Sequence, residues 1–270
     1  MYKSFLPNCV PTLETSIESA ELIKQAANTF LATKLAFFNQ LSDISEACGA
    51  DIRDVTKGLS YDPRIGGEYM DPGPGLGGSC LVKDTQSLVQ TGALKGVDLS
   101  IARESIAANK KRKASLEKRV VKACGGSVEG KSLAVLGLTF KANTDDLRES
   151  PSLALIPALV ALGAEIRAYD PHGMSSASHF LPNIYYGIDE YDVLENADAL
   201  VILTNWDSFK TLDIKRVKIL LKTPTIIDFR NLFSAEKMEG FNYLPLGYNV
   251  DSRTNSAQLE EPFKLRSSNG

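Results

Sequence analysis

The chain is poor in the residues on which several classes of protein depend. Among its 270 residues are two histidines, and four cysteines at positions 9, 48, 80 and 124 that form no CxxC pair. That spacing matches no metal site or disulfide framework, so we expect a reduced, cytoplasmic protein without a bound metal. A cysteine hydrolase needs a histidine base. Because His172 and His179 both fall in expected loops of the second half, that class is disfavoured.

Long apolar runs and long basic runs are also missing. The longest apolar stretch, residues 153–164, is too short to span a bilayer and contains a proline. The first residues lack the apolar core of a signal peptide. With 30 basic and 33 acidic residues, the net charge is −3, which is unlike a nucleic-acid scaffold. We therefore expect neither a membrane nor a nucleic-acid partner.

The first half of the chain is predicted to be helical. Apolar residues recur at helical spacing from Ser16 to Cys48, and Gly49 is a stop signal. A shorter helix is expected over residues 52–58, then a surface loop over 60–78 and a helix from about 84 to 94. A long helix over residues 99–124 connects the two halves. We assign it one exposed basic face: Lys110, Lys111, Arg112, Lys113, Lys118, Arg119 and Lys122.

The second half alternates between strands and helices. Strands are predicted over residues 132–138, 165–171, 199–204, 225–229 and 241–247, with a helix opened by Ser150 and Pro151. This alternation indicates an α/β fold with a doubly wound parallel sheet. The expected domains are a helical unit (10–98), a connecting helix (99–124), a sheet unit (130–250) and a disordered tail (251–270).

The run GPGLGGSCLVKDT, residues 73–85, is the strongest functional signal. Four glycines at positions 73, 75, 77 and 78 precede Cys80. Such glycine density allows positive φ angles or a close approach to a ligand. Free cysteines are more often small buried hydrophobes, which we expect of Cys48 and Cys124. For Cys80, beside the cation Lys83, we predict a reactive thiolate.

Two further groups of polar residues accompany this run. Lys24 and Asn28 share one face of the first helix, and Asp84 lies one turn beyond Cys80. The segment GLTFKANTDDLRESPS, residues 137–152, follows the first strand of the second half, where doubly wound folds bind ligands. It carries Lys141 and Arg148 but no GxGxxG fingerprint. Its alternative interpretation is a turn tied by local salt bridges.

Together and in this order, the three motifs resemble the C-terminal two thirds of the UDP-glucose/GDP-mannose dehydrogenase family. The matching segments are AELIKQAANTFLATKLAFFNQ, DPRIGGEYMDPGPGLGGSCLVKDT and GLTFKANTDDLRESPS, and the similarity spans roughly residues 10–250. Family members oxidise a sugar CH2OH group to a carboxylate in two NAD-dependent steps, through a cysteine-bound thiohemiacetal and thioester.

The resemblance implies a role for each candidate residue. Cys80 would capture the aldehyde, Lys24 would stabilise oxyanions, and Asn28 with Asp84 would hold the hydrolytic water. The implied substrate-binding residues are Lys24, Asn28, Arg64, Tyr69, Gly73, Gly77, Phe140, Lys141 and Arg230, with Arg64 reaching into a neighbouring subunit; those near the cofactor are Lys83 and Arg148. The implied fold is a central helical domain that forms a homodimer, joined to a Rossmann-like domain that binds the UDP-sugar.

The chain departs from the family pattern in places. Leu81 and Val82 replace an aromatic–proline pair, and Phe229 replaces the glycine of a DGR motif before Arg230. The family also begins with a Rossmann domain that carries GxGxxG, a motif this sequence lacks. We therefore expect the chain alone to bind NAD poorly and to be inactive, with a separate N-terminal NAD domain as a possible partner.

Several alternatives stay open at this point. The chain is either the C-terminal portion of a dehydrogenase or a non-catalytic module that binds a nucleotide sugar and dimerises. DPRIGG, residues 62–67, favours UDP-glucose as substrate by resemblance. GDP-mannose and UDP-N-acetylhexosamine dehydrogenases share the cysteine loop.

Overall fold

The helical unit is built on α1 (Ile17–Cys48), which confirms the longest predicted helix. Ser16 caps its first turn and Gly49, at φ 71°, ends it in the left-handed conformation. The computed structural model describes residues 11–250. The expected disordered tail, residues 251–270, and the first residue of the expected helical domain lie outside the described residues.

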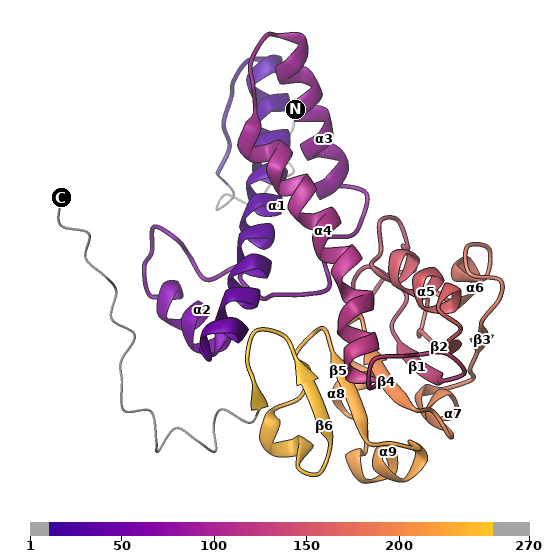
Figure 1. The fold of residues 1–270 in the computed structure, drawn as a ribbon. Helices are drawn as coiled ribbons and strands as arrows, with labels where there is room; N and C mark the ends of the chain where they lie inside the picture. Colours follow the sequence, from indigo (N-terminus) through magenta and orange to yellow (C-terminus); the bar gives the residue numbers. More distant parts are fainter. Residues whose placement is uncertain (1–10, 251–270) are drawn as a thin grey trace.

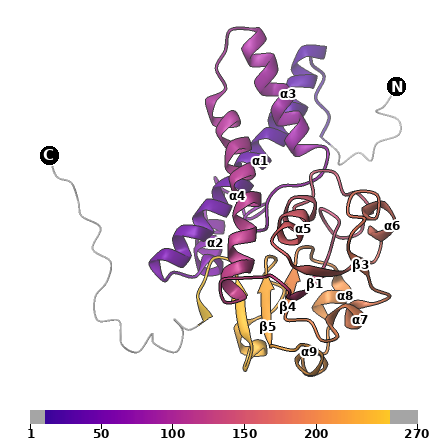
Figure 2. The ribbon, with the colours of Figure 1, turned by 45° about the vertical axis from the view of Figure 1, so that its right-hand side comes forward.

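Three more helices complete this unit: α2 (Ile52–Ser60), α3 (Leu81–Leu94) and α4 (Ser100–Ala123). In both views α1, α3 and α4 run side by side, and α4 leads down into the second unit (Figures 1 and 2). The buried apolar cluster of this unit is small and consists of Ala32, Leu76 and Val82. No helix within residues 11–250 is both long and apolar enough to cross a membrane.

The second unit is a six-stranded parallel sheet in the order β3-β2-β1-β4-β5-β6. Its strands are β1 (Ser132–Leu136), β2 (Glu165–Tyr169), β3 (Tyr185–Tyr186), β4 (Ala199–Ile202), β5 (Thr225–Asp228) and β6 (Asn242–Pro245). In register, Leu133 pairs with Ile166 on one side and Ala199 on the other. The predicted doubly wound sheet is confirmed. Only β3, with two residues, was missed.

Apolar clusters cover both faces of the sheet. Leu133 and Val135 of β1 belong to one cluster, and Ala134 and Leu136 to the other, as alternation along a strand requires. The helices that supply these layers, apart from α4, are short: α5 (Ser152–Ala161), α6 (Met174–Ala177), α7 (Glu190–Leu194), α8 (Asp207–Lys210), α9 (Ile214–Leu220) and the 3-10 helix η2 (Ala235–Met238).

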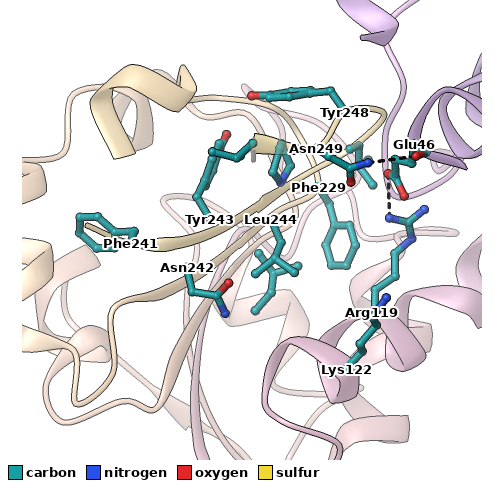
Figure 3. Close-up of a pocket in the computed structure, with 14 residues that line it drawn as sticks. Glu46, Arg119, Lys122, Phe229, Phe241, Asn242, Tyr243, Leu244, Tyr248 and Asn249 are labelled. Carbon is teal, nitrogen blue, oxygen red and sulfur yellow. Dashed lines mark hydrogen bonds and ion pairs between the residues drawn. The ribbon is translucent and has the colours of Figure 1, made fainter. Parts of the chain in front are cut away.

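Polar contacts centred on Glu46 join the segment after β6 to the end of α1 (Figure 3). Glu46 accepts from Arg119 at 2.9 Å and from the Gly247 amide at 2.8 Å. Asn249 donates to the Glu46 carbonyl at 3.0 Å. Glu46, Arg119 and Asn249 line part of a cavity of about 370 Å³ beside β6. The two units are therefore tied together at this end, independently of the glycine loop.

Two sequence expectations were wrong. Arg112 does not lie on the exposed basic face of α4: it is 5% exposed, and Asp43 of α1 pairs with it. The Lys113 side chain, which pairs with Glu149, is 11% exposed. The Arg119 side chain, which pairs with Glu46, is 28% exposed. Cys48 is exposed instead of buried, because it is the last residue of α1 and lies at the end of the helix bundle.

Candidate active site

A cavity of about 610 Å³ lies between α1, the glycine loop and the loop that joins β1 to α5. Most of the predicted site residues line it, although they come from distant parts of the chain. The wall contains Asn28, Tyr69, Gly73, Gly77, Cys80, Phe140, Lys141, Arg148 and Arg230. The fold thus brings the three sequence motifs together at one place.

Lys24, Asn28 and Asp84 form one hydrogen-bonded chain at the edge of this cavity. Lys24 donates to the Asn28 side-chain oxygen at 3.2 Å, and the Asn28 amide donates to Asp84 at 2.5 Å. The oxygen and the nitrogen of the Asn28 side-chain amide are thus both hydrogen-bonded, which fixes the orientation of the amide. The residue is 6% exposed. The i, i+4 spacing on α1 and the first turn of α3 create this arrangement.

Cys80 immediately precedes α3 and has an exposed side chain. Helix N-termini favour negative charge because their amide groups point outward. Arg148 lines the same cavity as Cys80. The pKa of its guanidinium is raised, chiefly by the hydrogen bond to the Asp146 carboxylate and also by Cys80. Lys83, which we predicted beside the thiolate, is exposed on the first turn of α3 and does not line the cavity.

The glycines of the loop contact protein atoms. A Cβ atom on Gly77 would lie 2.6 Å from the Phe140 Cβ and 3.0 Å from the Glu149 carbonyl. One on Gly78, at φ +82°, would lie 2.7 Å from the Phe140 ring. We expected close approach to a ligand or positive φ. The structure adds a third use, because glycine lets this loop pack directly on the sheet unit.

The β1–α5 loop contributes Phe140 and Lys141, with the Lys141 ammonium 5.5 Å from the centre of the Phe140 ring. Farther along, Arg148 pairs with Asp146 at 2.9 Å. Hydrogen bonding to Arg148 lowers the pKa of the Asp146 carboxyl. The turn tied by a local salt bridge is therefore present, and the same pair lines the cavity.

Arg230 reaches the cavity from the end of β5. Its guanidinium donates to the Leu203 carbonyl at 2.7 Å and to the Phe140 carbonyl at 3.1 Å. Burial lowers its pKa to about 10, so the group stays protonated at neutral pH. A partly buried, oriented guanidinium with further N–H donors suits an anionic ligand such as a phosphate.

Tyr69 and Arg64 come from the loop after α2. Tyr69 lines the cavity and has a φ angle of 60°, which is uncommon outside glycine. The Arg64 side chain is 87% exposed, pairs with Asp62 at 2.6 Å and is not part of the cavity wall.

Sequence reasoning missed three buried polar residues behind the glycine loop: Asn39, Asn109 and Arg112. All three bind backbone groups of that loop. A signal existed for Asn39, because it follows Asn28 by eleven residues, which is three helical turns. Both asparagines therefore face the same side of α1.

The sheet has the strand order of dinucleotide-binding folds, but its first loop does not fit NAD. The amides of Leu138 and Thr139 both donate to the Asp170 carboxylate, at 2.7 and 3.0 Å. Backbone amides of this loop are the groups that would bind a pyrophosphate. Within residues 11–250, no cluster of His, Cys, Asp or Glu side chains is suited to a metal ion.

Two family models match this chain. The central domain of the UDP-glucose/GDP-mannose dehydrogenase family matches residues 18–111, and the UDP binding domain of the same family matches residues 134–235. The chain belongs to this family. One match lies in each unit of the fold, and together they include all three sequence motifs.

Two bacterial relatives support the assignment to this family. UDP-glucose 6-dehydrogenase of Rhizobium meliloti (strain 1021) is 40% identical over 92% of this chain and 57% of its own length. UDP-glucose 6-dehydrogenase TuaD of Bacillus subtilis (strain 168) is 43% identical over 88% of this chain and 52% of its own length. The chain thus spans little more than half the length of these dehydrogenases.

Solved structures show the same fold. A UDP-glucose dehydrogenase from Pyrobaculum islandicum has a TM-score of 0.79 at 29% identity, over 92% of this chain and 54% of its own. An NDP-N-acetyl-D-galactosaminuronic acid dehydrogenase from Methanosarcina mazei Go1 has a TM-score of 0.79 at 28% identity, over 88% of this chain and 52% of its own. Dehydrogenases with different names therefore share this architecture.

Proposed function

We propose that this chain carries the nucleotide-sugar site and the covalent catalytic centre of an NAD-dependent dehydrogenase that oxidises UDP-glucose to UDP-glucuronate. The observation that carries the proposal is the convergence of Cys80, Asn28 and Arg230 on one cavity. We choose UDP-glucose over other nucleotide sugars because the Rhizobium meliloti and Bacillus subtilis relatives, at 40% and 43% identity, are both named UDP-glucose 6-dehydrogenase.

Cys80 is the proposed nucleophile. Its thiolate sulfur adds to the carbonyl carbon of the aldehyde at C6 of the sugar, and the C=O electron pair moves to oxygen to give a thiohemiacetal anion. Lys24 stabilises the oxyanion, since its ammonium lies 3.2 Å from Asn28 at the edge of the cavity. Conversion of that adduct to a thioester is a two-electron oxidation, for which NAD would be the acceptor. Asn28 and Asp84 hold the water that attacks the thioester carbonyl and expels the Cys80 thiolate.

The remaining cavity residues are assigned to the nucleotide end of the substrate. Arg230 and Lys141 supply positive charge for the diphosphate, and Phe140 supplies apolar surface. Tyr69 and the backbone of Gly73 and Gly77 are assigned to the sugar. Arg148 and Lys83 are assigned to the side of the site that faces the cofactor.

NAD is the hydride acceptor that family membership implies. The first loop of the sheet unit does not fit this cofactor, because Asp170 occupies its amides. We therefore derive no hydride-transfer step from the described residues. Their part is to bind and orient the sugar, hold the covalent intermediate and position the hydrolytic water.

A homodimer through α1 is the proposed assembly. Ile23, Phe30, Phe37 and Ile44 are all more than half exposed and recur every seven residues along α1. Such a stripe is typical of a helix that packs against a second helix. Lys34, in the same stretch, binds the carbonyls of the loop that carries Arg64. We assign Arg64, an exposed residue of that loop, to the site of the second copy.

Calorimetric titration with UDP-glucose and with GDP-mannose tests the substrate assignment. We expect UDP-glucose to bind more tightly, and Lys141→Ala to weaken its binding roughly tenfold through loss of a charge-assisted contact. The matched control is Lys118→Ala, which removes the same charge from an exposed position of α4 outside the cavity. Equal or tighter binding of GDP-mannose would overturn the assignment to UDP-glucose.

Catalysis is tested by mixing the chain with a separately expressed N-terminal domain of a relative, NAD and UDP-glucose. We expect NADH to form with the wild-type chain and not with Cys80→Ser. If the two pieces associate, bind UDP-glucose and yet form no NADH, the chain is a binding and dimerisation module instead of an enzyme part.

A further inference from the structure

The conformation of the glycine loop needs an explanation that the catalytic residues do not supply. The six residues before Ser79 include four glycines, and ordering such a segment costs more conformational entropy than ordering any other kind. Nevertheless Cys80 must be held at a defined place relative to Arg230 and Phe140. Something outside the loop has to restrain it.

The restraint comes from buried polar side chains of two helices. Asn39 of α1 accepts from the Gly73 amide at 2.8 Å. Arg112 of α4 donates to the carbonyl of the same glycine at 3.0 Å. Both polar groups of one backbone unit are thus bound, one from each helix.

Asn109 restrains the loop three residues farther along. Its side-chain oxygen accepts from the Leu76 amide at 2.7 Å, and its side-chain amide donates to the Leu76 carbonyl at 3.3 Å. Only an amide side chain offers an acceptor and a donor in this geometry. A third point follows at Gly78, whose amide donates to the Arg148 carbonyl at 2.7 Å.

The restraining side chains are themselves fixed. Arg112 also pairs with Asp43 of α1, and Asn39, Asn109 and Arg112 are each at least 94% buried. Buried polar groups are expensive unless they are hydrogen-bonded, so their presence in the core between α1 and α4 calls for a specific role. Their partners are the backbone groups of the loop that ends at Cys80.

We propose that Asn39, Asn109 and Arg112 are positioning residues for Cys80, which clamp the glycine loop from α1 and α4 and so preorganise the substrate cavity. The inference rests on the proposed function, because it assigns the purpose of the clamp to that same site. None of the three residues is assigned a contact with the reacting atoms. They act through the backbone of Gly73 and Leu76.

Asn109→Leu tests the clamp, since leucine keeps the shape and removes both bonds to Leu76. The control is Ser105→Ala, which removes a buried hydrogen bond to Thr33 between the same two helices without touching the loop. A second pair of variants separates loss of the hydrogen bond from a change in the side chain as such. Asn39→Asp keeps the oxygen that accepts from the Gly73 amide, whereas Asn39→Leu removes it.

Each variant is measured by hydrogen exchange of residues 73–79, by its melting temperature and by its affinity for UDP-glucose. We expect Asn109→Leu and Asn39→Leu to raise loop exchange and to weaken UDP-glucose binding roughly tenfold, equivalent to about 1.4 kcal/mol. Ser105→Ala and Asn39→Asp should leave both near wild type. The inference is overturned if Asn109→Leu and Ser105→Ala give equal loop exchange and equal affinity.

The exchange measurement also keeps the two proposals apart. If wild type binds no UDP-glucose, the proposed function fails. If wild type binds and the leucine variants bind equally well despite rapid loop exchange, the clamp holds the loop but does not serve the site, and the positioning role is rejected.

Discussion

Gly78→Ala tests whether the glycine loop is packed against the sheet unit as described. Gly78 has a φ angle of +82°, and an added Cβ atom would lie 2.7 Å from the Phe140 ring. The left-handed backbone costs an alanine about 1–2 kcal/mol. Overpacking against the ring adds about 1–3 kcal/mol. We therefore expect Gly78→Ala to lower the free energy of unfolding by about 2–5 kcal/mol.

Gly66→Ala is the matched control. Gly66 has a similar φ angle of +70°, but an added Cβ atom would meet nothing within 4 Å. It should therefore lose only the backbone contribution of about 1–2 kcal/mol. Denaturant melts of both variants give the difference, and Phe140→Ala in the Gly78→Ala background should recover much of it. Equal losses in Gly78→Ala and Gly66→Ala would refute the packing of this loop on Phe140.

Two other predictions concern different parts of the molecule. Phe30→Asp places a charge in the exposed stripe of α1 and should convert a dimer into a monomer, as measured by size-exclusion chromatography with light scattering. Ile219→Asp, at an 82% exposed position of α9, is the control and should leave the dimer intact. A dimer that persists in Phe30→Asp rejects α1 as the interface. Burial raises the pKa of Tyr186 from 10.0 to about 12. Its stabilising contribution is therefore complete below pH 10 and lost as the pH rises through about 12. Tyr186→Phe should show a smaller decline in stability over that interval, and an unchanged decline would contradict the assignment.

The elements that the sequence predicted well are those with strong local signals. The helix α1 has apolar spacing, Ser16 before it and Gly49 after it, and it was predicted to within a residue. The strands β1, β2, β4, β5 and β6 are short apolar runs between turns and were each predicted one to three residues too long. The strand β3 has no run of its own, because it consists of two residues held only by pairing with β2.

The exposed face of α4 was misassigned because we followed the run of basic residues and not the helical periodicity of the apolar positions. Arg112 lies four and eight residues before Leu116 and Val120, which are both fully buried. That spacing places Arg112 on the inner face regardless of its neighbours Lys111 and Lys113. Local composition suggested a solvated stretch, whereas the period of the buried positions would have identified the inward-facing arginine.

The candidate residues of the site were found by motif, but their arrangement depends on tertiary packing. Nothing local in the sequence places Arg230 against Phe140, ninety residues earlier, or Asn109 against Leu76. The use of Gly77 and Gly78 for contact with Phe140 also follows only from the packing of the two units. Sequence reasoning supplies the candidate residues here, and the fold determines which of them meet.

The accessibility of the Cys80 thiol tests whether the nucleotide sugar binds in the cavity that this residue lines. The chain is treated with iodoacetamide with and without saturating UDP-glucose, and alkylation at each cysteine is followed by mass spectrometry. Cys48 is also exposed but lies at the far end of α1, so it serves as the internal control. We expect UDP-glucose to slow alkylation of Cys80 at least roughly tenfold and to leave that of Cys48 unchanged. Equal alkylation rates of Cys80 with and without UDP-glucose, under conditions in which the sugar nucleotide is bound, would contradict this expectation.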